Sequence, residues 1–375
     1  MAGLDAEPVD NYQGVTETTN PIKGSDGQRA PRKTVAGRAE HMGAITGQGT
    51  SPQTRDFFVC DFFGAAPKHD LASMEHPIFS LSTRPDRRIL SYHHNATEIT
   101  VTPSVKGRAT IFDADILIFC ISQLMAALNA GRDTSRTLTL TAHDLLRATE
   151  RETSGDSYRR LRDAFERLAG TRITTNIRTG PNHDPVETTT GFGLIESWEI
   201  VRKTRAGRMV SVSVTLSDWL YRAVLSKSVL TLNRAYFSLR KPLERRLYEL
   251  ARKHCGRQPD WRVSVEVLLK KSGSTSPRRV FRAMLREIIR ADSLPDYVLV
   301  EEPGDIIAFS PRALVVDISD APVLSPAALE AARTLKPGAD VYALESEWRH
   351  FWTTSGRAKL RSADKAFLGW VAQKR

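Results

Sequence analysis

One sequence pattern occurs twice in this chain, and it restricts the folds that the chain can adopt. The first copy is "TLTLTAHDLLRATERETSGDSYRRLRDAFERLAGTRITTNI" (137–177), and the second is "WRVSVEVLLKKSGSTSPRRVFRAMLREIIRADSLPDYVLV" (261–300). Each copy has an extended entry, a short helix around a Leu-Leu pair, a polar turn, a longer amphipathic helix and a β-prone stretch. The chain is therefore expected to contain two similar units.

A helix before each copy and a β-hairpin after it complete each unit. The preceding helices are predicted over 114–130 and in "RKPLERRLYELARKHCG". The second hairpin is predicted in "DYVLVEEPGDIIAFS" with its turn at 302–305, and the first joins "GFGLIESWEIVRK" to "RMVSVSVTL" across 204–207. This order of elements is the outline of a winged helix. We therefore predict an α+β fold with two tandem winged-helix domains.

The segments around the two units differ in composition. Residues 1–52 are rich in Gly, Thr, Pro and Gln and poor in large apolar side chains, so we expect a disordered leader. The first winged-helix domain is placed at 53–220, the second at 221–318, and a helical C-terminal extension at 319–375. In the extension, helical spacing of Leu344, Trp348, Phe351 and Trp352 favours packing onto the second domain over stacking on single-stranded bases.

The longer helix of the second unit has one apolar face and one cationic face. Between Lys270 and Arg290 there are seven basic residues and one acidic residue, and Arg279, Arg282, Arg286 and Arg290 form one stripe. Ser276 is expected to cap this helix, with Pro277 in its first position. Arginine pairs bidentately with guanine, so the stripe predicts a DNA-reading helix; a solvated basic face is the alternative. The candidate DNA-binding residues here are Lys270, Lys271, Ser276, Arg278, Arg279, Arg282 and Arg286.

The equivalent helix of the first unit carries mixed charges. We align Arg159-Arg160-Leu161 with Arg278-Arg279-Val280. Asp163 and Glu166 dilute the arginines, which is as typical of a solvated or protein-facing helix as of a DNA contact. The candidate DNA-binding residues of this unit are Ser157, Arg159, Arg160 and Arg162.

The helix in "PLERRLYELARKH" is amphipathic as well. Its leucines are expected to point inward, and Arg245, Arg246, Arg252 and Lys253 outward. Such arginines would either contact phosphates or belong to a scaffold helix.

The overall charge favours a polyanionic partner. Lysine and arginine number 54, aspartate and glutamate 43, and the net charge is +11, so nucleic acid is expected first and an anionic membrane second. The apolar run "ADILIFCISQLMAALNA" is interrupted by Ser122 and Gln123 and is short for a membrane span, so it predicts a core helix. No signal peptide is visible at the start of the sequence, which favours a cytoplasmic protein with no membrane partner.

The sequence shows no pattern typical of an enzyme, so we predict no catalytic residues, no cofactor and no metal site. Its three cysteines are far apart, and neither a phosphate-binding loop nor a hydrolase motif is present. A rolling-circle nickase needs two histidines on one side of a strand, but the adjacent His93 and His94 would point to opposite faces beside Tyr92.

Four segments together resemble the plasmid replication initiator protein A family of alphaproteobacterial replicons. They are "MEHPIFSLSTRPDRRILSYHH", "ITVTPSVKGRATIFDADILIFCISQLMAALNAG", "LERRLYELARKHCG" and "SPRRVFRAMLREI". The resemblance spans roughly residues 57–375. It implies a theta-type initiator that binds repeated double-stranded origin sites, helps to open an AT-rich segment, and recruits the host initiator and the replicative helicase or its loader.

The resemblance also implies a monomer–dimer equilibrium in which the first domain forms the dimer interface. The repeat predicts that a monomer places its two units in successive major grooves, about 34 Å apart. A winged-helix transcription regulator, including one that represses its own gene, is the alternative; a DNA-nicking enzyme is less favoured. The absence of a recognisable ligand-sensing domain favours the initiator.

Overall fold

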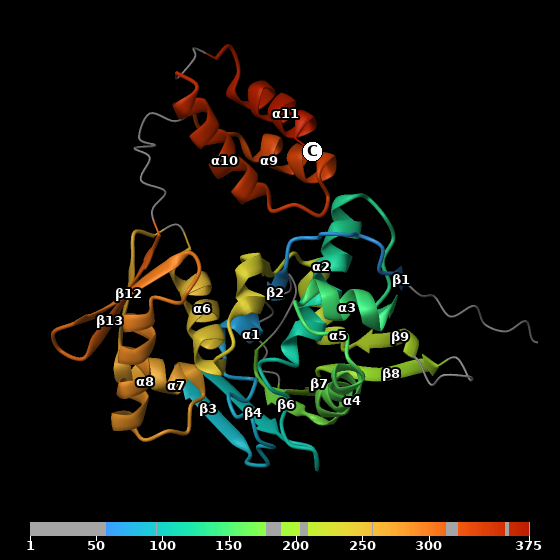
Figure 1. Ribbon diagram of the computed structural model, residues 1–375, viewed down its shortest axis with the longest axis vertical. Coiled ribbons are helices and arrows are strands. Elements are labelled where there is room, and N and C mark those ends of the chain that lie inside the picture. The colour runs from blue at the N-terminus through green and yellow to red at the C-terminus, as the bar shows by residue number, and fades with distance from the viewer. Residues whose placement is uncertain are drawn as a thin grey trace, which may run out of the picture. The chain divides into compact units, whose positions relative to one another are not determined.

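A computed structural model describes residues 58–94, 96–177, 189–202, 209–256, 258–312, 322–356 and 360–374 (Figure 1). The predicted leader at 1–52 and the predicted first hairpin turn at 204–207 lie outside the described residues. The described part is mixed α+β with several small sheets, in agreement with the predicted class. None of its helices is long and apolar enough to cross a membrane.

The first unit is built around a four-stranded sheet with the order β1-β5-β9-β8. Its elements are β1 (Phe58–Val59), α2 (Ala114–Asn129), β5 (Thr137–Leu140), α3 (Ala142–Ala148), α4 (Gly155–Gly170), β8 (Ile195–Arg202) and β9 (Met209–Leu216). The strands β8 and β9 pair antiparallel, and β5 pairs with β9. Nearly all of α2 is buried, so the prediction of a core helix is confirmed.

The second unit repeats this order of elements. It comprises α6 (Pro242–Cys255), β11 (Trp261–Ser264), α7 (Val265–Ser272), α8 (Arg278–Ala291), β12 (Tyr297–Glu302) and β13 (Ile306–Pro311). Its sheet has the order β11-β13-β12, which matches β5-β9-β8 strand for strand. The predicted hairpin is confirmed, because Glu302 pairs with Ile306 across the turn. Figure 1 shows this hairpin beside α8.

The burial pattern corrects the alignment of the two long helices by one residue. Leu161, Phe165 and Leu168 of α4 are buried, and the buried residues of α8 are Phe281, Leu285 and Ile288. These buried residues of the two helices have the same spacing along the chain. Val280, which the sequence alignment matched to the buried Leu161, is instead 48% exposed. In the corrected register, Arg162 corresponds to Arg282 and Glu166 corresponds to Arg286.

A second four-stranded sheet was not predicted. It has the order β3-β4-β6-β7. Its strands are β3 (Leu90–His94), β4 (Thr97–Thr102), β6 (Arg172–Thr175) and β7 (Thr190–Gly193). The short segments β2 (Lys68–Asp70), α1 (Leu71–Glu75), α5 (Asp218–Leu225), β10 (Val229–Thr231) and η1 (Arg234–Ser238) connect the two units. Within this connection, β10 pairs antiparallel with β2.

Two arginines of α6 that were predicted to face outward are buried between the two units. The Arg245 guanidinium lies 2.6 Å from the Asp115 carboxylate of α2, and both side chains are at most 2% exposed. Arg246 donates to the carbonyls of Ser73 and Met74 at the end of α1 and to that of Lys271 in α7. A buried guanidinium group is tolerated where its N–H donors have acceptors, and these carboxylate and carbonyl oxygens supply them. These arginines therefore join the two units.

The C-terminal helices have a core of their own. They are α9 (Pro326–Leu335), α10 (Val341–Thr354) and α11 (Ala363–Gln373). Leu344 and Trp348 of α10 pack with Phe367 and Val371 of α11. The helical extension is thus confirmed, but the expectation that its apolar residues pack onto the second domain is wrong, because the apolar faces of the three helices cover one another.

Candidate nucleic-acid interface

Helix α8 begins one residue later than the sequence predicted. Pro277 occupies the N-cap position with an extended backbone, no side chain caps the helix, and Arg278 is its first residue. The prediction of a cap at Ser276 is therefore wrong: Pro277 has ψ 144°, which keeps it outside the helix. The uncapped N-terminus leaves backbone N–H groups available to an anion at the end of the helix that carries the arginines.

One carboxylate of the hairpin binds two arginines of α8. Asp305, which follows β12 in the turn, accepts hydrogen bonds from Arg278 and Arg282; the Arg282 Nε lies 2.9 Å from Asp305 Oδ1. These bonds, the one from Arg278 foremost, lower the pKa of Asp305 below its ordinary value. The hairpin thus holds the guanidinium groups of the first helical turns in fixed positions while leaving part of each exposed.

A second carboxylate of the hairpin binds the next arginine of the stripe. Arg286 donates through Nε and Nη2 to the two oxygens of Glu301, at 2.8 and 2.7 Å. The hydrogen bond from Arg286 lowers the pKa of Glu301. Both carboxylates therefore stay ionised at neutral pH, and the hairpin partly neutralises the cationic face. This pairing was not predicted from the sequence; the acidic pattern "EEPGD" at the predicted turn was the available signal.

Three further candidates of this unit have different surroundings. Arg279 is exposed, and no side chain of the described chain pairs with it. Lys270 is exposed and pairs with Glu266 one helical turn away. Lys271 is only 6% exposed, and its ammonium group binds Glu75, so its burial rules it out of a DNA-contacting surface and we leave it out of the interface.

The candidates on α4 are largely neutralised by neighbours on the same helix. Arg159 and Arg160 both pair with Asp156, and Arg162 lies 3.3 Å from Glu166. Ser157 lies in the first turn, where its backbone N–H donates to the capping Ser154. In the corrected register a glutamate stands at the position that Arg286 occupies in α8. The first unit therefore offers a weaker cationic face than the second.

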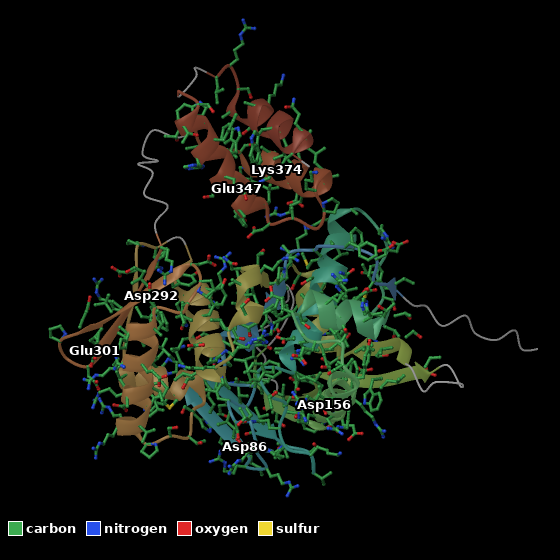
Figure 2. All side chains as sticks on the ribbon, viewed as in Figure 1. Asp86, Asp156, Asp292, Glu301, Glu347 and Lys374 are labelled. Carbon is green, nitrogen blue, oxygen red and sulfur yellow. The ribbon has the colours of Figure 1, made fainter. Side chains whose placement is uncertain are left out.

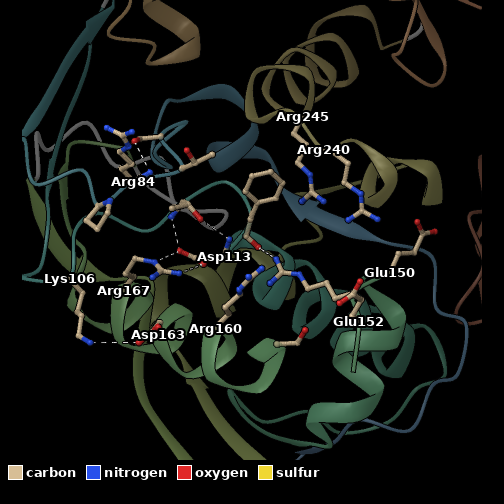
Figure 3. Close-up of a pocket in the computed structure, with 17 residues that line it drawn as sticks. Arg84, Lys106, Asp113, Glu150, Glu152, Arg160, Asp163, Arg167, Arg240 and Arg245 are labelled. Atoms are coloured by element: carbon tan, nitrogen blue, oxygen red, sulfur yellow. Dashed lines mark hydrogen bonds and ion pairs between the residues drawn. The ribbon is translucent and has the colours of Figure 1, made fainter. Parts of the chain in front are cut away.

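A charged cavity of about 610 Å³ adjoins the start of α4 (Figure 3). It brings the predicted Ser157 and Arg160 together with basic residues that were not selected from the sequence, among them Arg84, Lys106 and Arg240. Arg84 belongs to the quoted motif "STRPDRR", whose run of arginines was the available signal. The buried Asp113, which also lines the cavity, accepts two hydrogen bonds from Arg167, at 2.7 and 2.8 Å, so these two groups are already engaged.

One histidine of the pair contacts Tyr92: the ring centroid of His94 lies 6.3 Å from that of Tyr92. Tyr92 is buried, whereas the adjacent His93 is exposed and lies 3.6 Å from Glu98. Burial raises the pKa of the Tyr92 hydroxyl, which opposes its use as a nucleophile. In the described residues, no group of three or more His, Cys, Asp and Glu side chains is placed to hold a metal ion.

Comparison with known proteins adds one curated relative and two solved structures. "Putative replication protein" of Wigglesworthia glossinidia brevipalpis is 38% identical over 262 residues, covering 69% of this chain and 94% of that protein. Two crystal structures of domains 2 and 3 of RctB match with TM-scores of 0.47 and 0.44 at 14% and 15% identity. They cover 64% and 63% of this chain, and 96% and 95% of theirs.

The family model of replication initiator protein A matches residues 68–299. This range contains α1, both helix pairs α3–α4 and α7–α8, and the buried arginines of α6. It thus includes most of the two repeated units, and the relative described above covers more than two thirds of the chain at an identity above 30%. The chain belongs to the replication initiator protein A family.

Proposed function

We propose that this protein is a plasmid replication initiator that binds repeated duplex sites in an origin through two winged-helix domains. The observation that carries the proposal is the exposed row of arginines on α8, held by the hairpin carboxylates at the end of a helix-turn-helix. The repeated order of elements and the matching sheet orders support the assignment of two winged helices. We place these domains at 53–220 and 221–318, with the C-terminal helices as a third part.

In this proposal, α8 enters a major groove with its N-terminal half. Arg279 is free to pair with a base edge or a phosphate, and Arg282 and Arg286 are already oriented by the hairpin. The uncapped start of α8 adds backbone N–H donors for a phosphate. Helix α4 contributes less, because Asp163 and Glu166 dilute its cationic face and Glu166 stands where α8 has Arg286. A monomer with both units on one face of the duplex is the binding form.

We further propose that the protein opens DNA without cutting it and then recruits host initiation and helicase proteins. Melting would draw on binding free energy, since deforming a site of 20–30 base pairs costs on the order of 1–6 kcal/mol. The burial of Tyr92, which raises the pKa of its hydroxyl, supports a non-enzymatic role.

The test is the binding of the full chain to the DNA that flanks its gene. Fluorescence anisotropy on tandem repeats beside an AT-rich stretch should show tight binding, and a shuffled sequence should bind far more weakly. The Arg279→Ala/Arg282→Ala/Arg286→Ala variant should lose about 1–3 kcal/mol per base-reading arginine. Equal binding to both sequences, or a folded triple variant that binds like the wild type, would contradict the proposal.

A plasmid carrying the repeats then separates initiation from simple repression. The wild-type gene supplied in trans should support replication of a reporter plasmid that has these repeats as its only origin. Binding confined to the promoter of the gene, without replication, would instead identify a transcription regulator.

A further inference from the structure

The loop Ser82–Arg88 lies between the starts of the two long helices. Ser82, Thr83, Arg84 and Pro85 line the cavity that contains Ser157 and Arg160 of α4. Ser82, Asp86 and Arg88 line a second cavity, of about 340 Å³, that contains Ser274, Thr275 and Ser276 just before α8. In the view of Figure 2, Asp86 lies near the lower edge of the molecule, closer to Asp156 on α4 than to Glu301 on β12. One short loop therefore adjoins both predicted DNA-reading helices.

A buried carboxylate fixes the conformation of this loop. The Asp86 side chain is 5% exposed and accepts hydrogen bonds from the backbone N–H and the guanidinium of Arg88 and from Arg108, at 2.9–3.2 Å. The hydrogen bond from the Arg88 guanidinium lowers the pKa of Asp86, which therefore stays ionised. Arg88 also donates to Thr275 Oγ1 at 3.2 Å, which ties the loop to the turn of the second unit.

The loop is also pressed against a neighbouring turn. Gly107 has φ +94°, and a Cβ atom added there would lie 3.0 Å from both Asp86 N and Pro85 Cα. A side chain at this position would therefore displace the loop, as well as strain the backbone. Arg87 Nε donates to the carbonyl of Val105 at the tip of the same turn, at 3.0 Å. Two surface turns thus form one rigid unit.

This rigid unit presents unused arginine donors. Arg84 and Arg87 are exposed, and within the described chain no side chain pairs with the Arg84 guanidinium. Arg87 uses one of its five N–H donors on Val105, so four remain. Arg240, which lines the same cavity as Arg84, is likewise exposed, with no ion-pair partner among the described residues. The arginines of α4, by contrast, are engaged by carboxylates.

We infer that the loop Ser82–Arg88 is a third DNA contact, which binds backbone phosphates between the two major grooves entered by α4 and α8. When two helices lie in successive major grooves, the minor groove between those grooves faces the protein surface that separates the helices. A phosphate backbone runs along each side of this minor groove. A loop anchored on that surface reaches the backbone but does not enter a groove as a helix does. Its arginines would therefore fix position without reading sequence. This inference rests on the proposed function.

The test uses an Arg84→Ala/Arg87→Ala variant of the full chain. Its affinity for a single origin repeat is measured by anisotropy over a series of salt concentrations. Loss of two phosphate contacts should reduce the slope of log K against log salt by about two units and weaken specific and random DNA by the same factor. Ethylation interference should lose its signal at the phosphates between the two patches that hydroxyl radicals show as protected.

The matched control is Arg361→Ala/Lys365→Ala, which removes the same charge from one exposed position just before α11 and one within it. It should leave the salt slope unchanged, and unfolding of both variants is followed by circular dichroism. An unchanged slope in the loop variant, or an equal decrease in the control, overturns the inference while the proposed function stands. A wild-type protein that does not bind duplex DNA refutes the proposed function itself.

Discussion

Arg286 on α8 donates two hydrogen bonds to Glu301 on β12, so the cationic helix is paired with its own hairpin before any DNA is bound. The pair leaves Arg286 more than half exposed, at 56% of its side-chain surface. In the proposed complex, a carboxylate this close to the DNA would repel phosphates of every sequence. Only a site that offers the guanidinium better partners than Glu301 would compensate for this repulsion, so the pair should favour specific over random DNA.

Neutralising this carboxylate should therefore weaken discrimination. In Glu301→Gln we expect random-sequence DNA to bind roughly fivefold more tightly at low salt, because a surface ion pair contributes up to about 1 kcal/mol. The affinity for the origin repeat should rise less. Competition binding with both DNAs measures the ratio. Glu347→Gln removes a charge that is paired with Lys374 on the C-terminal helices and is the control. An unchanged ratio in Glu301→Gln would show that the hairpin carboxylate has no part in specificity.

Arg279 gives a test of base reading that keeps the charge constant. In Arg279→Lys we expect about 1–3 kcal/mol of lost discrimination at one position of the site, since lysine lacks the bidentate geometry of arginine. The salt slope should stay the same because the charge is retained. Binding to a set of single-base variants of the repeat provides the measurement. If the Arg279→Lys variant keeps the full specificity of the wild type, Arg279 binds a phosphate and not a base.

DNA opening should occur without strand cleavage. Permanganate treatment of a supercoiled origin plasmid with the protein should reveal unpaired thymines in the AT-rich segment while the plasmid stays supercoiled. Tyr92 is buried, so Tyr92→Phe should retain opening. A specific nick or a covalent protein–DNA adduct that disappears in Tyr92→Phe would establish a nicking enzyme.

The ion pair between Arg245 and Asp115 should be a major element of stability. Both side chains are buried, Arg245 also donates to the carbonyls of Leu239 and Phe237, and its guanidinium lies over the rings of Phe112 and Tyr236. Arg245→Ala would leave Asp115 with one fewer partner, and we expect a loss of about 3–5 kcal/mol in the free energy of unfolding. Urea denaturation measures it. A loss below about 1 kcal/mol, as for an exposed pair, would contradict this role.

Acid should destabilise the protein through His76. Burial, together with the nearby Arg246 and Lys271, lowers the pKa of His76 to about 4 despite the opposing charge of Glu75. Between pH 6.5 and 4 the unfolded chain binds a proton at this residue and the folded chain does not, so stability falls as the pH falls. His76→Gln should flatten this part of the pH profile of the unfolding free energy. Identical profiles in both proteins would rule out His76 as the source.

The repeat and its hairpin could be predicted because they depend on local periodicity and turn chemistry. The sheet β3-β4-β6-β7 could not, since its short strands β4 and β6 pair across some seventy positions of sequence, as in Val101 with Ile173. Arg245 and Arg246 were predicted to lie on the surface because a periodicity argument assumes that charged residues face solvent. Their burial depends on acceptors from α1, α2 and α7, which only the tertiary structure brings together.

The candidate site was predicted in part for the same reason. The arginines of α8 could be predicted because they share one helix and its periodicity. Lys271 fits the same basic pattern in the sequence, but in the fold it is buried and paired with Glu75. The carboxylates Asp305 and Glu301 follow α8 within the same unit, and the acidic pattern around the hairpin turn was a signal for them. The loop arginines Arg84 and Arg87 lie far before α8 in sequence, so their relation to α8 depends on contacts that no spacing encodes.

The buried arginines of α6 have a consequence for the origin itself. Arg245 bonds to Asp115 of the first unit, and Arg246 bonds to α1 in the connection between the units, so turning one unit against the other would break buried polar contacts. One inserted base pair rotates the far half of a repeat by roughly 35° around the duplex, since a turn contains about 10–10.5 base pairs. The helical phase inside each repeat should therefore be far less free to drift in evolution than the length of DNA between repeats.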